Sequence, residues 1–299
     1  MPKRTIYVQR PAHLTVKNKS LVIDNENGRC RIPLEDIWVL ILEERSISVG
    51  VALLSSLADA GIGTMICGEN HMPNGLYLPL GAHSRHSAIV EDQLAIPKPL
   101  KKQLWRRIVQ SKIGNQARCL DFLGVDGGDA LRVEARKVLS GDTTNREAVA
   151  AAEYFRRLIP NATRRNGPYT AALDYGYAVL RAGIGRCAVA GGWLVSKGLF
   201  HSNDLNAFNL VDDLLEPFRP VVDLVVFARG LSGELTPKKK RELASVFEYL
   251  VIVGGKKHNV QSAIEAELDG LKAAVVGNDP AKLVLPMLIP LERCEVEGR

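Results

Sequence analysis

The sequence predicts an α+β protein in which a small strand-rich N-terminal domain, residues 1–82, precedes a larger all-α domain, residues 83–299. Before Gly81, short runs of β-branched and aromatic residues alternate with turn signals. After Gly81, apolar residues recur with a period near 3.6 over longer segments. The chain has 299 residues, and a typical domain has roughly 100 to 200, so the length allows one large or two ordinary domains.

The N-terminal domain is expected to contain short strands and one helix. Residues 37–42 form a continuous apolar run, typical of a strand buried on both faces. Residues 51–60 have a helical pattern, and Gly61 suits the position that ends a helix. The other predicted strands are short segments bounded by turn residues: 5–9, 20–24, 29–33, 63–67 and 75–80.

The second domain is expected to consist of helices alone. Pro97 and Pro99 separate the first two helices, because proline and the residue before it disfavour a continuing helix. The predicted helices share the 3.6-residue apolar period: 84–95, 100–123, 130–139, 146–158, 171–190, 206–215, 238–251 and 260–276.

The composition excludes several classes of protein. Apolar residues make up 46% and charged residues 24%, which are globular values and not those of a disordered or fibrous chain. The five cysteines form no CxxC pair, so neither a disulfide framework nor a structural zinc site is expected. Apolar runs are far shorter than the ~20 residues that cross a bilayer, and the basic start enters no apolar signal segment. We therefore expect a cytoplasmic protein without a membrane partner.

The chain carries a net charge of +6, which makes an anionic partner plausible. Basic residues concentrate in two clusters, residues 98–107 and 237–241. Such clusters are usually solvated helix faces. If they are functional, they would contact phosphates without reading sequence.

The densest polar cluster runs from His201 to Arg219. Asp213 and Glu216 are three residues apart, so on a helix their carboxylates can meet at one cation. The alternative is a solvated Asp213 and a Glu216 drawn out of helical geometry by Pro217. His201 can be turned toward these acids by a loop, and a set of nitrogen and oxygen donors suits Mg²⁺ or Mn²⁺.

Glu147 also admits two interpretations. Thr144 to Glu147 matches a capping box, in which the glutamate returns to the amide of the first cap residue. Alternatively, Glu147 shares the inward face of a helix that buries Ala148, Ala151, Ala152, Phe155 and Leu158. An inward carboxylate needs a partner, either a metal or a basic group such as Arg146.

Three motifs of the sequence occur in a characteristic order: Asn145-Arg-Glu147-Ala148, Leu173-Asp-Tyr-Gly-Tyr177, and His201 through Phe208-Asn209 to Asp213-Leu-Leu-Glu216-Pro-Phe-Arg-Pro220. In these motifs the chain resembles the family of CRISPR-associated protein one, the integrase subunit of the spacer-acquisition machinery. The resemblance covers nearly the whole chain and is greatest to members from type II systems.

The resemblance implies a divalent metal, Mg²⁺ or Mn²⁺, bound by the catalytic residues Glu147, His201 and Glu216, with Asp213 as a nearby acid that assists or orients. Many members have Gly where this chain has Ala148, and both residues are small. The implied activity is metal-dependent DNA transesterification that inserts short segments into the CRISPR array, together with metal-dependent DNA cleavage. The implied arrangement is a homodimer, with the N-terminal domain serving dimerisation and partner contacts and the second domain binding metal and DNA.

The implied partners are double-stranded DNA, as the incoming segment and as the repeat and leader, and CRISPR-associated protein two. The type II effector nuclease is a further candidate partner. Two other functions stay open: a non-catalytic DNA-binding scaffold that uses the basic clusters, and a stand-alone metal-dependent nuclease acting on branched repair DNA. The sequence contains no GxGxxG motif or P-loop, so nucleotide cofactors have no support.

Overall fold

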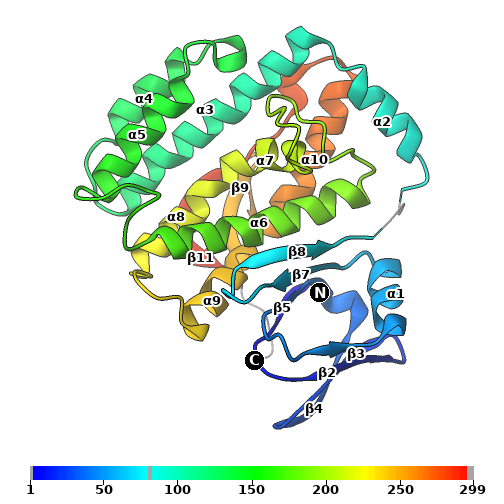
Figure 1. The fold of residues 1–299 in the computed structure, drawn as a ribbon. Coiled ribbons are helices and arrows are strands. Elements are labelled where there is room, and N and C mark those ends of the chain that lie inside the picture. The colour runs from blue at the N-terminus through cyan, green and yellow to red at the C-terminus, as the bar shows by residue number, and fades with distance from the viewer. Residues whose placement is uncertain (1–2, 80–82, 295–299) are drawn as a thin grey trace.

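The structure, a computed structural model, describes residues 3–79 and 83–294. It has the predicted α+β class, with strands concentrated between residues 4 and 77 and helices dominating from His86 onward (Figure 1). The proposed boundary between residues 82 and 83 adjoins residues 80–82, which lie outside the described part, as does the end of the predicted strand 75–80. Within the described residues, no helix is both long and apolar enough to span a bilayer.

The N-terminal part contains two four-stranded sheets. The first has the order β1-β5-β7-β8, in which only the β7–β8 pair is antiparallel, and the second has the order β4-β3-β2-β6. All six residues of β5 are buried, as the continuous apolar run predicted. The elements are β1 (Arg4–Val8), β2 (His13–Lys17), β3 (Ser20–Asn25), β4 (Gly28–Pro33), β5 (Ile37–Leu42), β6 (Ser48–Val49), α1 (Val51–Asp59), β7 (Gly63–Cys67) and β8 (Pro73–Tyr77).

The helices of the second part follow the apolar periods closely. The predicted helix 206–215 begins later, at Asn209, because the Asn206 side chain accepts from the Phe208 amide and holds a turn there. The helices are α2 (His86–Leu94), α3 (Lys98–Phe122), α4 (Gly128–Lys137), α5 (Arg146–Leu158), α6 (Thr170–Ala190), α7 (Asn209–Leu215), α8 (Arg219–Ala228), α9 (Pro237–Ala244) and α10 (Val260–Val276).

The prediction that this part is entirely helical is wrong in one region. A three-stranded antiparallel sheet has the order β10-β9-β11 and is built from β9 (Tyr249–Val253), β10 (Lys256–Asn259) and β11 (Met287–Arg293). The predicted helix 238–251 ends as α9 at Ala244. Residues of β9 alternate between buried and half-buried, and Gly254 and Gly255, both at positive φ, turn the chain into β10.

The two parts share a core. In Figure 1, α6 lies between β8 of the first sheet and helices such as α7 and α3. Trp38 of β5 packs edge-on against Phe247 at a centroid distance of 4.5 Å. Both rings lie where a Cβ on Gly183 of α6 would stand, at 2.5 Å from Phe247 and 2.8 Å from Trp38. A glycine at this position therefore lets α6 lie directly on the sheet and fixes the helices that carry the candidate site. The five cysteines are free, as predicted.

Candidate active site

Glu147 lies in the first turn of α5, but the predicted capping box is not formed. Asp142, in a 3₁₀ turn before the helix, accepts from the backbone amides of Arg146 at 2.8 Å and Glu147 at 3.0 Å. Asn145 adopts a left-handed conformation with φ of 50°, which brings Asp142 under the helix end. The Glu147 side chain is therefore free to face inward, where it is 21% exposed.

The inward face of α5 is rotated from the predicted one by about a quarter to a third of a turn. Ala150 and Tyr154 are its buried residues, whereas Ala148 and Ala152 are exposed. Glu147 precedes Tyr154 by two turns and shares this face. The basic partner of Glu147 is Lys112 of α3, and Arg146 pairs instead with Glu134.

Glu216 lies where α7 passes through a 3₁₀ turn, Glu216–Phe218, into α8. Its φ and ψ are −56° and −42°, so Pro217 does not draw it out of helical geometry. The side chain is buried, and its Oε1 accepts from Arg219 Nε at 2.9 Å. Burial alone would raise the pKa of Glu216, but the charges of Lys112 and Arg219 lower it to about 2.

Lys112 joins the two glutamates. Its Nζ lies 2.6 Å from Glu147 Oε1 and 2.5 Å from Glu216 Oε2. Burial works to lower the pKa of Lys112, yet the two carboxylates raise it, so the ammonium stays charged. Sequence reasoning missed this residue, although one signal was present: Lys112 follows Ile108 by four residues on the apolar face of α3, where an unpaired lysine would be costly.

His201 is oriented by Asp213. The fully buried Asp213 carboxylate accepts from the amides of Leu199, Phe200 and His201 at 2.6, 3.0 and 3.1 Å, and its Oδ1 lies 2.6 Å from His201 Nδ1. Gly198 permits this loop, because a Cβ there would lie 2.6 Å from Asp213 Oδ2. With Nδ1–H donated to Asp213, the His201 Nε2 keeps its lone pair.

Asp213 and Glu216 therefore do not meet at one cation, contrary to the spacing argument. Asp213 faces the loop 199–201, and Glu216 faces Lys112 and Arg219. The pKa of His201 is raised, first by the hydrogen bond to Asp213 and further by the charges of Glu216 and Glu147. His201 is thus an electrostatic neighbour of both glutamates.

The donors at this centre fit a divalent metal by their chemistry. Two carboxylates from different helices converge on one cation, and the buried Glu216 Oε2 has no hydrogen-bond donor although it lies within ion-pair distance of Lys112. The His201 imidazole, held by Asp213, is close enough for the charges of both glutamates to raise its pKa. Among residues 3–79 and 83–294, no three acidic, histidine or cysteine side chains are gathered closely enough to hold a metal, and Lys112 takes the position between the carboxylates.

A buried network of hydrogen bonds lies behind the two glutamates and connects α5 to α8. Asp223 of α8 accepts from the hydroxyls of Tyr154, at 3.0 Å, and Tyr177. The Arg219 guanidinium lies 4.5 Å from the centre of the Tyr177 ring. Burial raises the pKa of Asp223 to about 6, against the opposing effect of both tyrosines. The network links α8, which follows Glu216, to α5, which carries Glu147.

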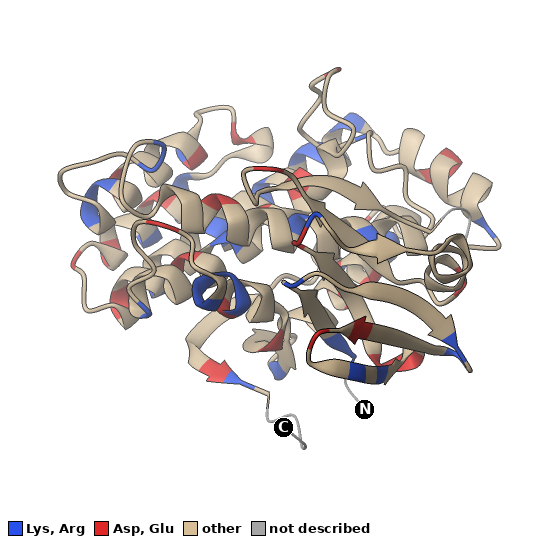
Figure 2. Cartoon of the chain, turned by 60° about the horizontal axis from the view of Figure 1, so that its bottom comes forward, with Lys and Arg blue, Asp and Glu red and all other residues tan. Residues whose placement is uncertain are grey.

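Most charged side chains of the second basic cluster, residues 237–241, bind other groups of the chain, although only Lys240 is buried. Lys240 is buried and paired with Glu43 of the N-terminal part, and Arg241 donates to Gln9 at 2.5 Å. The Lys239 ammonium donates to the carbonyls of Ser232 and Glu234. Elsewhere, basic and acidic residues intermingle along the helices and strands (Figure 2). Most of the charges of this cluster therefore hold the fold together, and only Lys238 is fully free of such contacts within the described residues.

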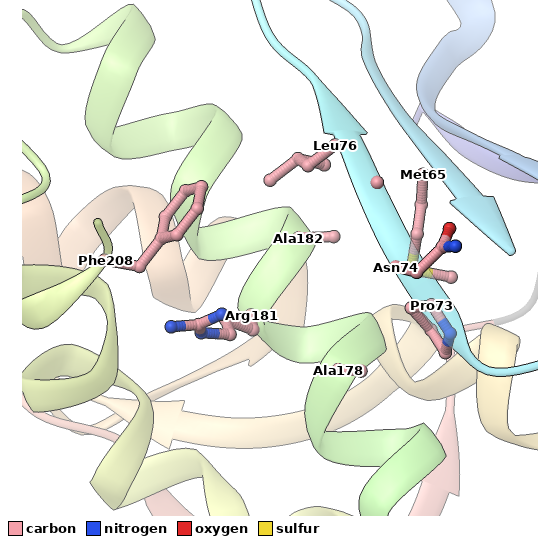
Figure 3. A pocket seen from close by; sticks show the side chains of 9 residues that line it. Met65, Pro73, Asn74, Leu76, Ala178, Arg181, Ala182 and Phe208 are labelled. Carbon is pink, nitrogen blue, oxygen red and sulfur yellow. The ribbon is translucent and has the colours of Figure 1, made fainter. Parts of the chain in front are cut away.

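A separate cavity of about 170 Å³ lies between β8 and α6 (Figure 3). Arg181 and Phe208 border it on one side and Leu76 and Pro73 on the other. Arg181 is already bound to Asp212, at 2.7 Å, and stacks over Phe208. This cavity holds no acidic or imidazole group and is distinct from the glutamate centre.

A strand-rich part is joined to a helical part that brings one buried and one half-buried carboxylate to a single lysine, with an oriented imidazole as their electrostatic neighbour. This combination defines a class of protein suited to metal-dependent phosphodiester chemistry. Residues 6–250 match the family model described as CRISPR associated protein Cas1. The chain belongs to the Cas1 family.

Known proteins agree with this membership. The CRISPR-associated endonuclease Cas1 of Neisseria meningitidis serogroup C (strain 8013) is 40% identical over 304 residues, covering 99% of this chain and 100% of that protein. A casposase bound to integration product has a TM-score of 0.75 at 16% identity, covering 93% of this chain and 92% of its own. A Cas6-RT-Cas1–Cas2 complex has a TM-score of 0.72 at 15% identity, covering 94% of this chain and 36% of that chain. The two structures show the same fold.

Proposed function

We propose that this CRISPR-associated endonuclease of the Cas1 family joins and cuts DNA at one centre, in which Glu147, His201 and Glu216 hold a divalent metal. Spacer integration is the function of the chain, as its family membership gives it. The observation that carries the assignment of residues is the convergence of the Glu147 and Glu216 carboxylates on a single cation position beside His201. Mg²⁺ and Mn²⁺ both suit such donors.

Each residue of the centre has its own role in the proposed transesterification. Bound Mg²⁺ or Mn²⁺ supplies a Lewis acid that favours the deprotonated 3′-hydroxyl of an incoming DNA end and stabilises negative charge on the attacked phosphate. Glu147 and Glu216 present anionic oxygens, and Arg219 keeps Glu216 ionised and in place. Asp213 holds the His201 ring so that Nε2 faces away from it. Asp213 is thus a positioning residue in this proposal, with both of its oxygens engaged by the loop.

The proposal extends to partners. Double-stranded DNA, as the inserted segment and as the repeat and leader, is the substrate, and the chain acts as a homodimer with CRISPR-associated protein two. The type II effector nuclease is a further candidate partner. The strand-rich residues 1–82 serve dimerisation and partner contacts, and residues 83–299 bind metal and DNA. Support comes from a solved relative that is a Cas1–Cas2 complex and from another that is bound to an integration product.

Strand transfer of a labelled duplex into a supercoiled plasmid bearing a CRISPR array tests the proposal. Wild type and Glu216→Gln are compared with CRISPR-associated protein two present and Mn²⁺, Mg²⁺ or chelator added. We expect metal-dependent joined product with wild type, and loss of joining but not of DNA binding with Glu216→Gln. Equal joining by both proteins would overturn the residue assignment. Cutting without joining would favour the stand-alone nuclease, and binding without either reaction would favour the scaffold.

A further inference from the structure

A single carboxylate, that of Asp223, connects three helices behind the glutamate centre. Asp223 lies in the middle of α8 and is 1% exposed. Tyr154 of α5 donates from its hydroxyl to Asp223 Oδ2 at 3.0 Å, and Tyr177 of α6 donates to Oδ1. Both oxygens of the carboxylate are therefore engaged, one by each neighbouring helix.

A carboxylate at this position is costly for folding. Burial raises the pKa of Asp223 to about 6, although the two tyrosine hydroxyls favour its charged form. The charges of Arg219 and Arg164 also act to lower this pKa, but each of these arginines forms its ion pair with another carboxylate. Apolar side chains would fill the same space without this penalty. A buried polar group whose bonds are satisfied instead fixes one arrangement of its neighbours, which indicates a role in geometry.

The hydrogen bond from Tyr177 leads to Glu216. The Arg219 guanidinium lies over the Tyr177 ring, 4.5 Å from its centre, and Arg219 Nε donates to Glu216 Oε1 at 2.9 Å. Arg219 and Asp223 are four residues apart in α8, so they share one face of this helix. Because the Tyr177 hydroxyl is fixed on Asp223, its ring offers Arg219 one defined surface. The orientation of the Glu216 carboxylate thus depends on Asp223 through two side chains.

The hydrogen bond from Tyr154 leads to Glu147. Tyr154 is fully buried and lies two turns after Glu147 on the inward face of α5. Its bond to Asp223 ties α5 to α8 and so helps to set the separation of the two carboxylates. This separation is short, since Lys112 Nζ lies 2.6 Å from Glu147 Oε1 and 2.5 Å from Glu216 Oε2. A small shift of either helix would take one carboxylate out of reach of a shared cation.

We propose that Asp223 is a positioning residue of the metal centre, whose bonds to Tyr154 and Tyr177 set the separation and orientation of Glu147 and Glu216 and thereby the affinity for a divalent cation. Asp223 is not a ligand itself, because both of its oxygens accept from tyrosines. Replacing a group that orients a metal ligand typically weakens metal binding about 10- to 100-fold. The inference rests on the proposed function, since it needs a metal between the two glutamates.

Mn²⁺ binding to the full-length chain, measured by electron paramagnetic resonance, tests the proposal. The binding that wild type shows and Glu216→Gln lacks reports on the centre. We expect Tyr154→Phe and Tyr177→Phe each to weaken it about tenfold, because each keeps the ring and removes one bond to the carboxylate. Tyr249→Phe is the matched control, since Tyr249 donates to the carboxylate of Glu242 on α9 at 2.6 Å. It should lower the midpoint of urea unfolding and leave Mn²⁺ affinity unchanged.

Two replacements of Asp223 separate geometry from charge. In Asp223→Asn, the amide accepts from one tyrosine and donates to the other, so most of the Mn²⁺ affinity should remain. Asp223→Ala loses both bonds and should weaken Mn²⁺ binding at least as much as either tyrosine variant. Adding Tyr177→Phe to Asp223→Ala should have no further effect, because the bond that it removes is already absent. If Asp223→Ala does not fold, the two tyrosine variants, which keep their rings, decide the question.

Unchanged Mn²⁺ affinity in either tyrosine variant would overturn the inference, and so would an equal loss in Tyr249→Phe. Equal losses in Asp223→Asn and Asp223→Ala would overturn it as well, because charge and not geometry would then be responsible. These outcomes leave the proposed function intact as long as wild type binds Mn²⁺ and joins DNA. If wild type binds no Mn²⁺, or if Glu216→Gln binds it equally, the proposed metal centre is wrong and this inference falls with it.

Discussion

At the level of single residues, the candidate centre is a cluster of buried and half-buried charges. Lys112 and Arg219 keep Glu216 ionised with a pKa of about 2, although burial alone would raise it. The same carboxylates raise the pKa of Lys112 against the effect of its burial. A divalent cation would therefore exchange with an ammonium that already faces both glutamates. This exchange makes metal binding sensitive to charge at residue 112 and to protonation of His201.

Metal binding should weaken as the pH falls, starting above the usual range of histidine. The hydrogen bond to Asp213, together with the charges of Glu216 and Glu147, raises the pKa of His201, and its protonated ring cannot be a ligand. Below that pKa, we expect the Mn²⁺ affinity to fall about tenfold per pH unit, measured by electron paramagnetic resonance between pH 5 and 8. The folding stability of the metal-free protein should change with pH in the opposite direction. The interaction of protonated His201 with Asp213 stabilises the fold at low pH, and this contribution is lost as the pH rises through the raised pKa of His201. A flat affinity profile would exclude His201 as a ligand.

Replacing Lys112 with methionine should destabilise the metal-free protein and tighten its binding of metal. The change removes the cation between Glu147 and Glu216 and leaves only Arg219 beside Glu216; the loss of one partner costs about 3–5 kcal/mol in comparable buried pairs. Urea unfolding with chelator and with Mn²⁺ measures both effects, and we expect a larger stabilisation by Mn²⁺ in Lys112→Met than in wild type. Lys137→Met, at an exposed ion pair, is the control. Unchanged Mn²⁺ affinity in Lys112→Met would show that the ammonium does not compete.

Which site residues the sequence can predict depends on how local their partners are. Glu147, His201 and Glu216 are found by motif resemblance, and Asp213 by its place beside them. Lys112 and Asp223 are not found, because their partners lie 35 to 104 residues away and only the packing of α3, α5 and α8 brings them together. The local pattern at Thr144 predicted a capping box that does not form. Asp142 caps the helix instead, because Asn145 adopts a left-handed conformation that residue spacing does not reveal.

At the level of elements, the period of apolar residues predicts long helices well. It fails where the helical period of 3.6 residues changes to the two-residue period of a strand. The helices α3, α6 and α10 are long enough for an apolar stripe to be unambiguous. In residues 238–251, the helix α9 is followed by a 3₁₀ turn and then by β9. No glycine or proline between them marks the end of the helix. The short strand β2 was not predicted, although its five residues include two that favour strands, Thr15 and Val16. Short elements take their conformation largely from the elements they pair with, and β2 pairs with β3 and β6.

The glycines of α6 give an element-level prediction. Gly183→Ala should destabilise the protein by about 1–3 kcal/mol, because the new Cβ would lie 2.5 Å from Phe247 and 2.8 Å from Trp38, neither of which can move freely in the core. Gly114→Ala of α3 should instead stabilise by about 0.5–1 kcal/mol. Its Cβ would meet only the end of the flexible Arg118 side chain, at 3.4 Å. Thermal unfolding measures both, and equal effects of the two substitutions would contradict the close packing of α6.

At the level of the whole molecule, the strand-rich and helical parts behave as one packed unit in the described residues. One continuous core includes Trp38 and Met65 of the first sheet together with helical residues such as Leu180 and Phe247. A buried ion pair crosses the same junction, between Glu43 after β5 and Lys240 of α9. Tyr7 of β1 donates to the other oxygen of Glu43 at 2.8 Å. We therefore expect the strand-rich and helical parts to unfold together.

Replacing one partner of the Glu43–Lys240 pair should lower the free energy of unfolding far more than replacing both. Lys240→Met leaves a buried carboxylate without its cation and should cost about 3–5 kcal/mol, whereas the double variant Lys240→Met with Glu43→Gln should recover most of that loss. The exposed pair of Lys257 and Glu292, whose atoms are 2.6 Å apart, is the matched control, and Lys257→Met should cost less than about 1 kcal/mol. Urea unfolding followed by both fluorescence and far-ultraviolet circular dichroism measures these values. Because the pair joins the two parts, all variants should keep a single coincident transition, and separate transitions in wild type would mean that the shared core does not couple them.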